Sequence, residues 1–342
     1  MQSKGYNQFQ NNIKPVGLMN VKLNCYMNSV IQCLFHLKKF RYYFINRKNF
    51  SKEDQPVSFE LRNIMLRLND TKNREPFSLS KFKEIMGEIN DIFKGSGGAD
   101  ASDLLRYIFS SLSLEQTNCI GPNISQMSSF NINTNNEEKC FQECRNRIGD
   151  STALNFAINY IRTEYHCFNK KIDRYKPSFK MHKPFYEFDN QCIIEIKYNE
   201  SLTIKDYINN MISKESKSFE YCPGCQDEVD CISRKSLYLT SDYFIINIDY
   251  GKNSLYNKKV EFENYLFVNS DMSKNAIYYN FLGAIFHTGK SSAYGHYFAC
   301  CRDGEKFYLL NDTQVEVISE NKFLNIKNKK DYKPCVIFYE KP

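Results

Sequence analysis

The spacing of apolar residues changes part-way along this chain of 342 residues. Up to residue 112 they recur at i, i+3, i+4 and i+7, a period that places them on one face of a helix. Beyond residue 155 they gather in short runs rich in β-branched and aromatic side chains, which is typical of strands. Helices followed by an antiparallel sheet predict an α+β fold, with room for a catalytic cleft where the two parts meet.

Four apolar sets carry the helical period, and several short runs carry the strand pattern. The helical sets are Val30, Cys33, Leu34 and Leu37; Leu61, Ile64, Met65 and Leu68; Phe82, Ile85, Met86 and Ile89; and Leu105, Ile108, Phe109 and Leu112. The strand runs begin at Cys192, Ser236, Tyr243, Tyr279, His296, Lys306 and Cys335, and an amphipathic helix between Leu202 and Met211 interrupts them.

Two polar segments flank the helical part. Residues 1–15 are predicted to form a loose tail, and residues 113–150, rich in Asn, Ser and Gln, a solvated insertion. Residues 16–340 therefore form one predicted domain without an internal repeat.

The charge and the cysteine count narrow the class of protein. The net charge of +7, from 46 basic and 39 acidic side chains, is spread without a run of like charges and only weakly favours an anionic partner. Without an apolar stretch of about 18 residues or an apolar N-terminal run, we expect a soluble protein of the cytoplasm or nucleus that binds no membrane. The 13 cysteines are odd in number, so we expect reduced thiols, each a candidate for catalysis or metal binding.

One cysteine stands where a helix begins. Cys25 directly precedes a strong helical pattern, and Asn24 is predicted to cap that helix. The positive end of the helix dipole would favour the thiolate of Cys25 and hence its nucleophilicity. Most cysteines at helix starts are ordinary half-buried residues, so the chemistry depends on finding a base.

The best candidate base among the five histidines is His296. It lies in YGHYFACC, where Gly295 allows another chain to approach closely and the following apolar run offers a rigid strand. Fifteen residues later, Asn311 and Asp312 end the next predicted strand, so a hairpin could bring either of them beside the imidazole. Such a third group fixes the tautomer and orientation of a catalytic histidine.

The order Cys, His, Asn is that of papain-like cysteine proteases, and two longer segments make the resemblance specific. GLMNVKLNCYMNSVIQCLFHL, from Gly17 to Leu37, resembles the cysteine box of the ubiquitin-specific proteases. YYNFLGAIFHTGKSSAYGHYFACCRDGEKFYLLNDTQVEVI resembles their histidine box, and the closing CVIFYEKP their last strand. The resemblance implies a papain-like fold with a thumb at about 16–112, fingers within about 155–240 and a palm from the remainder.

This resemblance also implies the function and the role of each residue. The function would be thiol-dependent cleavage after the C-terminal glycine of ubiquitin, by a monomer whose partners are ubiquitin and ubiquitinated proteins. The implied roles are Cys25 as nucleophile, His296 as base and acid, Asn311 as third member, Asn20 as oxyanion donor, Asp312 as supporting residue and His287 as structural neighbour.

A further segment, GGADASDLLRYIFSSL, resembles the family's Q-Q-D-A-x-E-F-L pattern. It implies that Asp100 and Asp103 meet arginines of the basic ubiquitin tail, and Tyr297, next to the base, would line the same passage. A structural reading is nearly as good, with Asp100 as N-cap and Asp103 as an acid in the first helical turn. Both readings could hold, although Gly98 and Ala99 replace the paired glutamines.

Two other departures concern the strands and loops around the site. Lys22 replaces a glycine of the family pattern, and if that position needs a positive φ, lysine costs about 1 kcal/mol there. Near Ile248, INIDYG stands where the family has L-K-R-F, so the basic edge of that strand is lost.

CPGC, from Cys222 to Cys225, is a good half-site for zinc. In the family another pair of zinc ligands lies at the place of residues 165–170. Here Cys167 occupies one of the two ligand positions and Lys170 the other, and His166 is next to Cys167, which makes joint binding of one metal awkward. We therefore expect metal-free fingers and no cofactor, with a bound zinc as the alternative. Cys140 and Cys144 look unrelated to this site.

Two other functions stay open at this point. One is a catalytically weak or inactive ubiquitin-binding scaffold of the same fold, favoured by Lys22 and by the missing glutamines. The other is a protein that binds zinc and nucleic acid, which the lack of a basic stripe disfavours. The intact set of Cys25, His296 and Asn311 argues against both.

Overall fold

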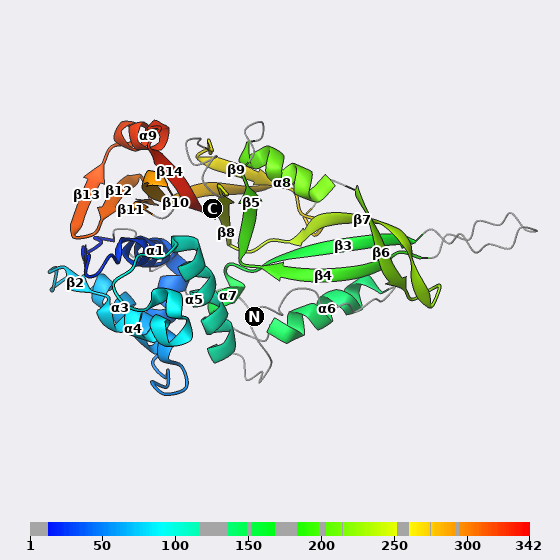
Figure 1. Cartoon of the computed structure of the whole chain (residues 1–342), viewed down its shortest axis with the longest axis horizontal. Coiled ribbons are helices and arrows are strands. Elements are labelled where there is room, and N and C mark those ends of the chain that lie inside the picture. Colours follow the sequence, from blue (N-terminus) through cyan, green and yellow to red (C-terminus); the bar gives the residue numbers. More distant parts are fainter. Residues whose placement is uncertain are drawn as a thin grey trace, which may run out of the picture.

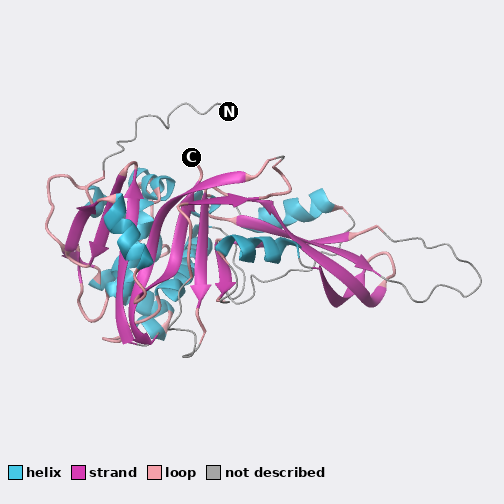
Figure 2. Ribbon diagram, turned by 90° about the horizontal axis from the view of Figure 1, so that it is seen from above, coloured by secondary structure: helices cyan, strands magenta, loops and turns pink. Residues whose placement is uncertain are grey.

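The computed structural model shows where the two kinds of element lie. The described residues are 13–116, 136–148, 152–167, 183–198, 203–213, 215–251, 260–273, 275–291 and 294–342. The molecule is elongated, with the N-terminal helices at one end, a large sheet beside them and a narrow sheet reaching toward the other end (Figures 1 and 2). No helix within the described ranges combines the length and the apolar character needed to cross a membrane.

The N-terminal helices bury most of the apolar sets that predicted them. Every residue of α1 (Cys25–His36) is buried, and this helix packs against β11 and β10 of the large sheet and against α5 (Ala101–Gln116). The sets in α3 (Pro56–Asn69), α4 (Ser80–Ile89) and α5 face the same core, except that Ile89 is exposed at the end of α4. The sequence analysis missed α2 (Lys38–Asn46), whose Phe40 and Phe44 are buried one turn apart.

The large sheet has the order β13-β12-β11-β10-β14-β8-β5, with β9 paired to β10. Its strands are β5 (Ile193–Lys197), β8 (Tyr243–Asp249), β9 (Tyr265–Val268), β10 (Ile277–Ser291), β11 (Tyr294–Asp303), β12 (Lys306–Asn311), β13 (Gln314–Ile318) and β14 (Tyr332–Glu340). The prediction of an antiparallel sheet is wrong for one pair, because β5 and β8 run parallel. Parallel neighbours need a long crossover, and here the chain between them forms α8 (Ile204–Ser213) and two strands of the narrow sheet.

Successive residues of the large sheet face two different cores. On β8, Ile245 packs in the core shared with α1, whereas Phe244 and Ile246 pack in a second core on the opposite face. Residues of α8 and α9 (Glu320–Asn328) cover that second core. The sheet is therefore buried on both faces, which makes it a rigid support for the side chains at its edge.

The narrow sheet has the order β4-β3-β7-β6. Its strands are β3 (Asn159–Cys167), β4 (Phe185–Gln191), β6 (Glu215–Cys222) and β7 (Asp227–Leu239), and it extends away from the helices (Figure 1). Only the end of β7 was predicted, as the run from Ser236. The other three strands carry many polar residues on one face, which hides their period.

The predicted solvated insertion contains two pieces of helix. The helix α5 continues to Gln116, and α6 (Glu137–Ile148) packs against β4. The sequence pattern did not predict the helix at 137–148, because only Cys140 and Phe141 are buried among residues 137–146, too few for a visible period. Residues 117–135 and 149–151, and 1–12 of the predicted tail, lie outside the described residues. A short α7 (Thr152–Asn155) then leads into the narrow sheet.

Candidate active site

Cys25 lies at the junction between the helical part and the large sheet. It is the first residue of α1 and only 7% exposed. Asn24 occupies the N-cap position as predicted, but its side chain makes no capping bond. Its backbone N–H instead donates to Oδ1 of Asn20, at 2.8 Å. The thiol still lies in the first turn, where the helix dipole favours its ionised form.

His296 is held near the beginning of β11, an interior strand of the large sheet, at the end of the strand that faces this helix start. Its neighbour Gly295 is packed so closely that a Cβ there would lie 2.1 Å from the carbonyl oxygen of Thr288 and 2.4 Å from Cε1 of His287. Only glycine fits, so the expected close approach at this position is confirmed. The buried ring of His287 packs on that of Tyr297, with 4.4 Å between centroids.

The two histidines have opposite electrostatic surroundings. Burial lowers the pKa of His287 to about 4, so this ring is neutral at physiological pH. The hydrogen bond to Cys25 raises the pKa of His296 to about 9 in spite of burial, with further help from Asn311. The imidazolium is thus the favoured form of His296 at physiological pH, beside the Cys25 thiol.

Asn311, at the end of β12, is the direct partner of the His296 ring. Its Oδ1 lies 2.6 Å from Nε2 of His296, whereas Oδ2 of Asp312 lies 3.9 Å from the same nitrogen. Because Nε2 is engaged by Asn311, Nδ1 is the ring nitrogen left for Cys25. The amide therefore fixes the tautomer and the ring orientation.

Asp312 instead joins the segment around Cys25 to the β12–β13 turn. Its carboxylate accepts hydrogen bonds from Nδ2 of Asn20, at 2.9 Å, and from Nδ2 of Asn28, at 2.8 Å. Its backbone has a φ of 52°, a left-handed conformation, and its carbonyl accepts from the N–H of Leu18 at 2.8 Å. The sequence analysis named Asp312 and Asn20 but missed Asn28, which has no distinguishing pattern in a buried helix.

The loop between Asn20 and Cys25 is backbone-strained. Lys22 and Leu23 both have a φ of 56°, a conformation that favours glycine. The condition attached to Lys22 in the sequence analysis, a positive φ at this position, is therefore met, while the second left-handed residue was not predicted. Leu23 is 59% exposed, so no burial of its side chain compensates for the strain.

An acidic cavity of about 320 Å³ lies where α5 meets β5, β8, β11 and β14. The three residues predicted to bind substrate, Asp100, Asp103 and Tyr297, all line it. Four carboxylates face one guanidinium there, an excess of negative charge that suits a cationic ligand. The charged lining residues are Asp100, Asp103, Glu195, Asp249 and Arg106.

The carboxylates of this cavity differ in how free they are to bind a ligand. Asp100 accepts from the backbone N–H of Ser102 at 2.7 Å and from the hydroxyl of Tyr297 at 3.1 Å, so the predicted helix-capping contact is present. Asp103 pairs with Arg106 at 2.6 Å, and burial together with Asp100 raises the pKa of Asp103. Arg106 also pairs with Glu195.

Two cavity carboxylates escaped the sequence analysis. Glu195 lies on β5 and Asp249 ends β8, 54 residues apart in the chain but on parallel neighbouring strands. Asp249 belongs to the INIDYG segment, where the loss of a basic edge was noted. Only the pairing of the two strands places its carboxylate in the same cavity as Asp103.

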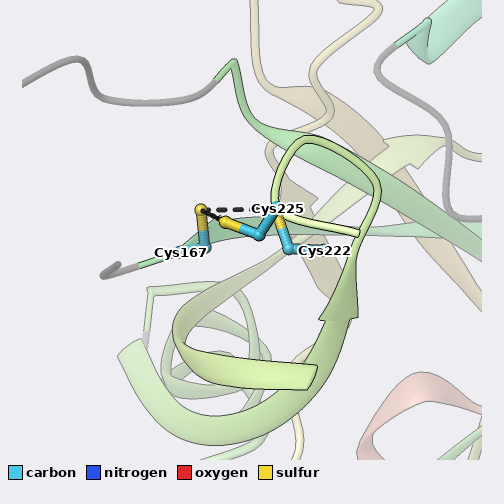
Figure 3. Close-up of side chains that lie close together, drawn as sticks. All are labelled: Cys167, Cys222 and Cys225. Carbon is cyan, nitrogen blue, oxygen red and sulfur yellow. Dashed lines mark hydrogen bonds between the residues drawn. The ribbon is translucent and has the colours of Figure 1, made fainter. Parts of the chain in front are cut away.

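Three cysteines gather near the tip of the narrow sheet (Figure 3). The sulfur of Cys167 lies 3.3 Å from that of Cys222 and 3.8 Å from that of Cys225. Burial opposes ionisation of Cys222, but hydrogen bonds from the Cys167 thiol and the turn backbone lower its pKa. Burial raises the pKa of Cys167 to about 12. His166 contacts Glu164 at 2.9 Å, and Lys170 lies outside the described residues.

The donor set of this cluster fits zinc at three of four positions. A tetrahedral zinc with bonds of about 2.3 Å places its sulfur ligands about 3.8 Å apart, close to the observed separations. Among the described residues, no fourth group joins the cluster. Cys231, however, lies directly opposite Cys167 in the sheet register and packs in the same small apolar cluster. Its thiol donates to the carbonyl of Val229 at 3.5 Å, toward the turn that holds Cys225.

A comparison with models of protein families shows the family to which this chain belongs. A family model described as ubiquitin carboxyl-terminal hydrolase matches residues 16–339. The chain belongs to this hydrolase family. The resemblance to ubiquitin-specific proteases that the two boxes carried is thereby confirmed.

Individual relatives of this hydrolase family are distant in sequence. The chain is 22% identical over 356 residues to ubiquitin carboxyl-terminal hydrolase 25 of Arabidopsis thaliana, covering 96% of this chain and 49% of that protein. It is 27% identical over 120 residues to hydrolase 12 of Saccharomyces cerevisiae, covering 31% of this chain and 10% of that protein. The chain thus spans less than half the length of these relatives.

A solved structure shares the fold of this hydrolase. The SAGA DUB module Ubp8/Sgf11/Sus1/Sgf73 bound to monoubiquitin contains a chain with a TM-score of 0.67 and 16% identity. The match covers 98% of this chain and 71% of that one. The predicted α+β, papain-like fold is therefore confirmed.

Proposed function

We propose that this chain is a deubiquitinating cysteine protease that hydrolyses the bond after the C-terminal glycine of ubiquitin in conjugates or precursors. The observation that carries the proposal is the convergence of Cys25 at the start of α1 with His296 on β11 and Asn311 on β12, with the ring bonded to Asn311 at 2.6 Å. Family membership and the acidic cavity lined by Tyr297, the neighbour of His296, support the substrate class.

In the proposed reaction, the Cys25 thiolate attacks the carbonyl carbon of the terminal glycine and forms a tetrahedral oxyanion. The backbone N–H of Cys25 and the side-chain amide of Asn20 would donate to that oxyanion. As the C–N bond breaks, the His296 imidazolium gives its proton to the leaving amine. Neutral His296 then takes a proton from water, whose oxygen attacks the thioester and releases the ubiquitin carboxylate and Cys25.

The acidic cavity would bind the basic tail of ubiquitin that leads to the scissile bond. Asp103, Glu195 and Asp249 offer carboxylates to its arginines, while Asp100 is engaged by the start of α5 and by Tyr297. Small side chains at the end of the tail suit a narrow passage beside Tyr297.

We also propose the division into parts that the resemblance implies. The helices to residue 112 form the thumb, the narrow sheet with α6 forms the fingers and the large sheet forms the palm. Cys167, Cys222 and Cys225 would hold a structural Zn²⁺ in the fingers, which cross-links β3 to the β6–β7 hairpin. We place the protein in the cytoplasm or nucleus, acting as a monomer on ubiquitinated proteins.

An electrophilic probe built on the ubiquitin C-terminus tests the proposed function. The purified chain should form one covalent adduct, and peptide mapping should place it on Cys25. Cys25→Ala should form no adduct but should still bind ubiquitin. Binding without any adduct in the unmodified chain would instead identify an inactive ubiquitin-binding scaffold.

A further inference from the structure

Lys83 is a buried cation beside the strained loop that precedes Cys25. It lies in the first turn of α4, and only 7% of it is exposed. Its ammonium donates to the backbone carbonyl of Lys22 at 2.9 Å and of Gly97 at 3.4 Å. Burial lowers the pKa of Lys83, and the nearby charge of Lys22 adds to this effect. A lysine is rarely buried unless its charge meets partners of this kind.

The two carbonyls belong to segments that both border the active site. Lys22 is the first of two consecutive left-handed residues between Asn20 and Cys25. Gly97 begins the segment that leads to Asp100 and the acidic cavity. One ammonium therefore ties the loop that carries the proposed oxyanion donors to the loop that leads to Asp100 and α5.

The position of the Lys22 carbonyl controls where Asn20 and Cys25 lie relative to each other. Each non-glycine residue in the left-handed region costs about 1 kcal/mol or more, so this loop would relax without an external contact. The hydrogen bond that the N–H of Asn24 donates to Oδ1 of Asn20 closes the loop around Lys22, so it depends on the backbone conformation of that loop. Lys83 supplies the contact from outside the loop that holds the Lys22 peptide in place.

We propose that Lys83 is a positioning residue that holds the loop before the nucleophile in the conformation needed for oxyanion stabilisation. The inference rests on the proposed function, because its consequence for catalysis requires that Cys25 and Asn20 act as assigned. It assigns to Lys83 no contact with the substrate. A misplaced donor lowers the rate of the chemical step more than the affinity for substrate.

Lys83→Met tests the proposal because methionine keeps the length of the side chain but removes the charge and the donors. With a fluorogenic ubiquitin C-terminal amide, we expect kcat to fall by about tenfold to a hundredfold while KM changes by less than about threefold. Lys83→Arg should restore most of kcat because it keeps the charge and the donors. Lys81→Met is the control, since Lys81 lies on the same helix but pairs with Glu60.

Two further measurements separate loop positioning from other effects. Alkylation of Cys25 by iodoacetamide should change little in Lys83→Met, because a small alkylating agent needs no oxyanion donor. Equal losses of kcat and of alkylation rate, or an unchanged kcat, would overturn the proposal. Hydrogen exchange at the Asn24 amide should become faster in Lys83→Met, and unchanged exchange would also overturn it. The unmodified chain could be inactive while hydrogen exchange at the Asn24 amide is still faster in Lys83→Met. That result would refute the proposed function but would leave intact the inference that Lys83 holds the loop.

Discussion

At the scale of single residues, neighbours in the sequence perform different tasks around His296. Asn311 is hydrogen-bonded to the ring, whereas Asp312 is turned by its positive φ toward Asn20 and Asn28. A carboxylate would stabilise an imidazolium more strongly than an amide does, yet the one available here is 3.9 Å away. The turn geometry therefore places Asn311 against the ring and leaves Asp312 to connect Asn20 with Asn28.

The first prediction distinguishes these two tasks by substitution. Asn311→Ala should lower kcat by about two orders of magnitude or more with a much smaller change in KM, since it frees the imidazole to adopt the wrong tautomer. Asp312→Ala should cost less, through a looser Asn20. Steady-state kinetics on a ubiquitin amide decides the ranking, and a larger loss of kcat in Asp312→Ala would reverse it. His287→Ala is the control, which should lower the melting temperature before it changes the chemistry.

The second prediction concerns the charge of His296. The bond to Cys25 is the main cause that raises its pKa from 6.5 to about 9, so activity should persist into mildly alkaline solution and fall as pH rises through about 9. The pKa of His296 is higher in the folded chain than in the unfolded chain, so protonation of His296 contributes its full stabilisation below pH 6.5. This contribution is lost as the pH rises through about 9.

Titration of the imidazole by NMR checks this prediction directly. In Cys25→Ala the main cause is removed while burial remains, so the pKa of His296 should fall toward 6.5. His287 serves as an internal reference, since burial holds its pKa at about 4 in both proteins. A pKa of His296 that is the same with and without the Cys25 thiol would contradict the assigned ion pair.

At the scale of secondary-structure elements, the narrow sheet depends on few apolar contacts near its tip. Within the part of the chain that the structure describes, the buried members of the cluster there are Tyr165, Phe185, Cys222 and Cys231. A metal held by β3 and by the β6–β7 hairpin would contribute stability that such a small core does not provide. The geometry thus favours the alternative of a bound zinc over the metal-free fingers expected from Lys170.

The third prediction follows from this cluster. Protein prepared with zinc present should carry about one equivalent per chain, and a strong chelator should lower its melting temperature. Cys222→Ser should lose the metal, and Cys144→Ser on α6 should keep it. Less than a tenth of an equivalent in the unmodified chain, with no effect of chelator, would restore the metal-free interpretation.

The fourth position of the site has a test of its own. If Cys231 completes the set, cobalt bound in place of zinc should show the absorption of four thiolate ligands, and Cys231→Ser should reduce it to that of three. A spectrum that is unchanged in Cys231→Ser would exclude this thiol and leave the fourth ligand elsewhere.

At the scale of the whole molecule, the sequence predicted what depends on local pattern. The α+β class, the four long helices and six of the eight strands described in the large sheet follow from periods that buried faces impose, whereas the short strands β9 and β13 were missed. Most of the narrow sheet was missed because polar residues interrupt the apolar runs of its strands, although β3 and β7 each bury several residues. The helix α6 was missed because only Cys140 and Phe141 are buried among residues 137–146. Asn28, Lys83, Glu195 and Asp249 were missed for another reason, since their roles arise only when distant segments meet.

The fourth prediction belongs to this scale, because the acidic cavity exists only where the helical part meets the sheet. Glu195→Gln and Asp249→Asn should each raise KM for a ubiquitin amide by about tenfold with little change in kcat, since the cavity binds the basic tail away from the bond that breaks. Glu195→Gln also removes a partner of Arg106, which leaves a less compensated positive charge facing that tail. Glu305→Gln, an exposed acid in the β11–β12 turn, is the matched control.

Ionic strength provides the independent check on the same cavity. If charge attraction draws the tail into it, kcat/KM should fall as salt rises from low to physiological concentration, since the screening length shortens to about 8 Å. The fall should be smaller in the double variant of Glu195 and Asp249, which has less charge to screen. A salt dependence that is identical in the double variant and the parent would show that the attraction arises elsewhere on the surface, and the cavity would then lose its proposed role in selecting a basic tail.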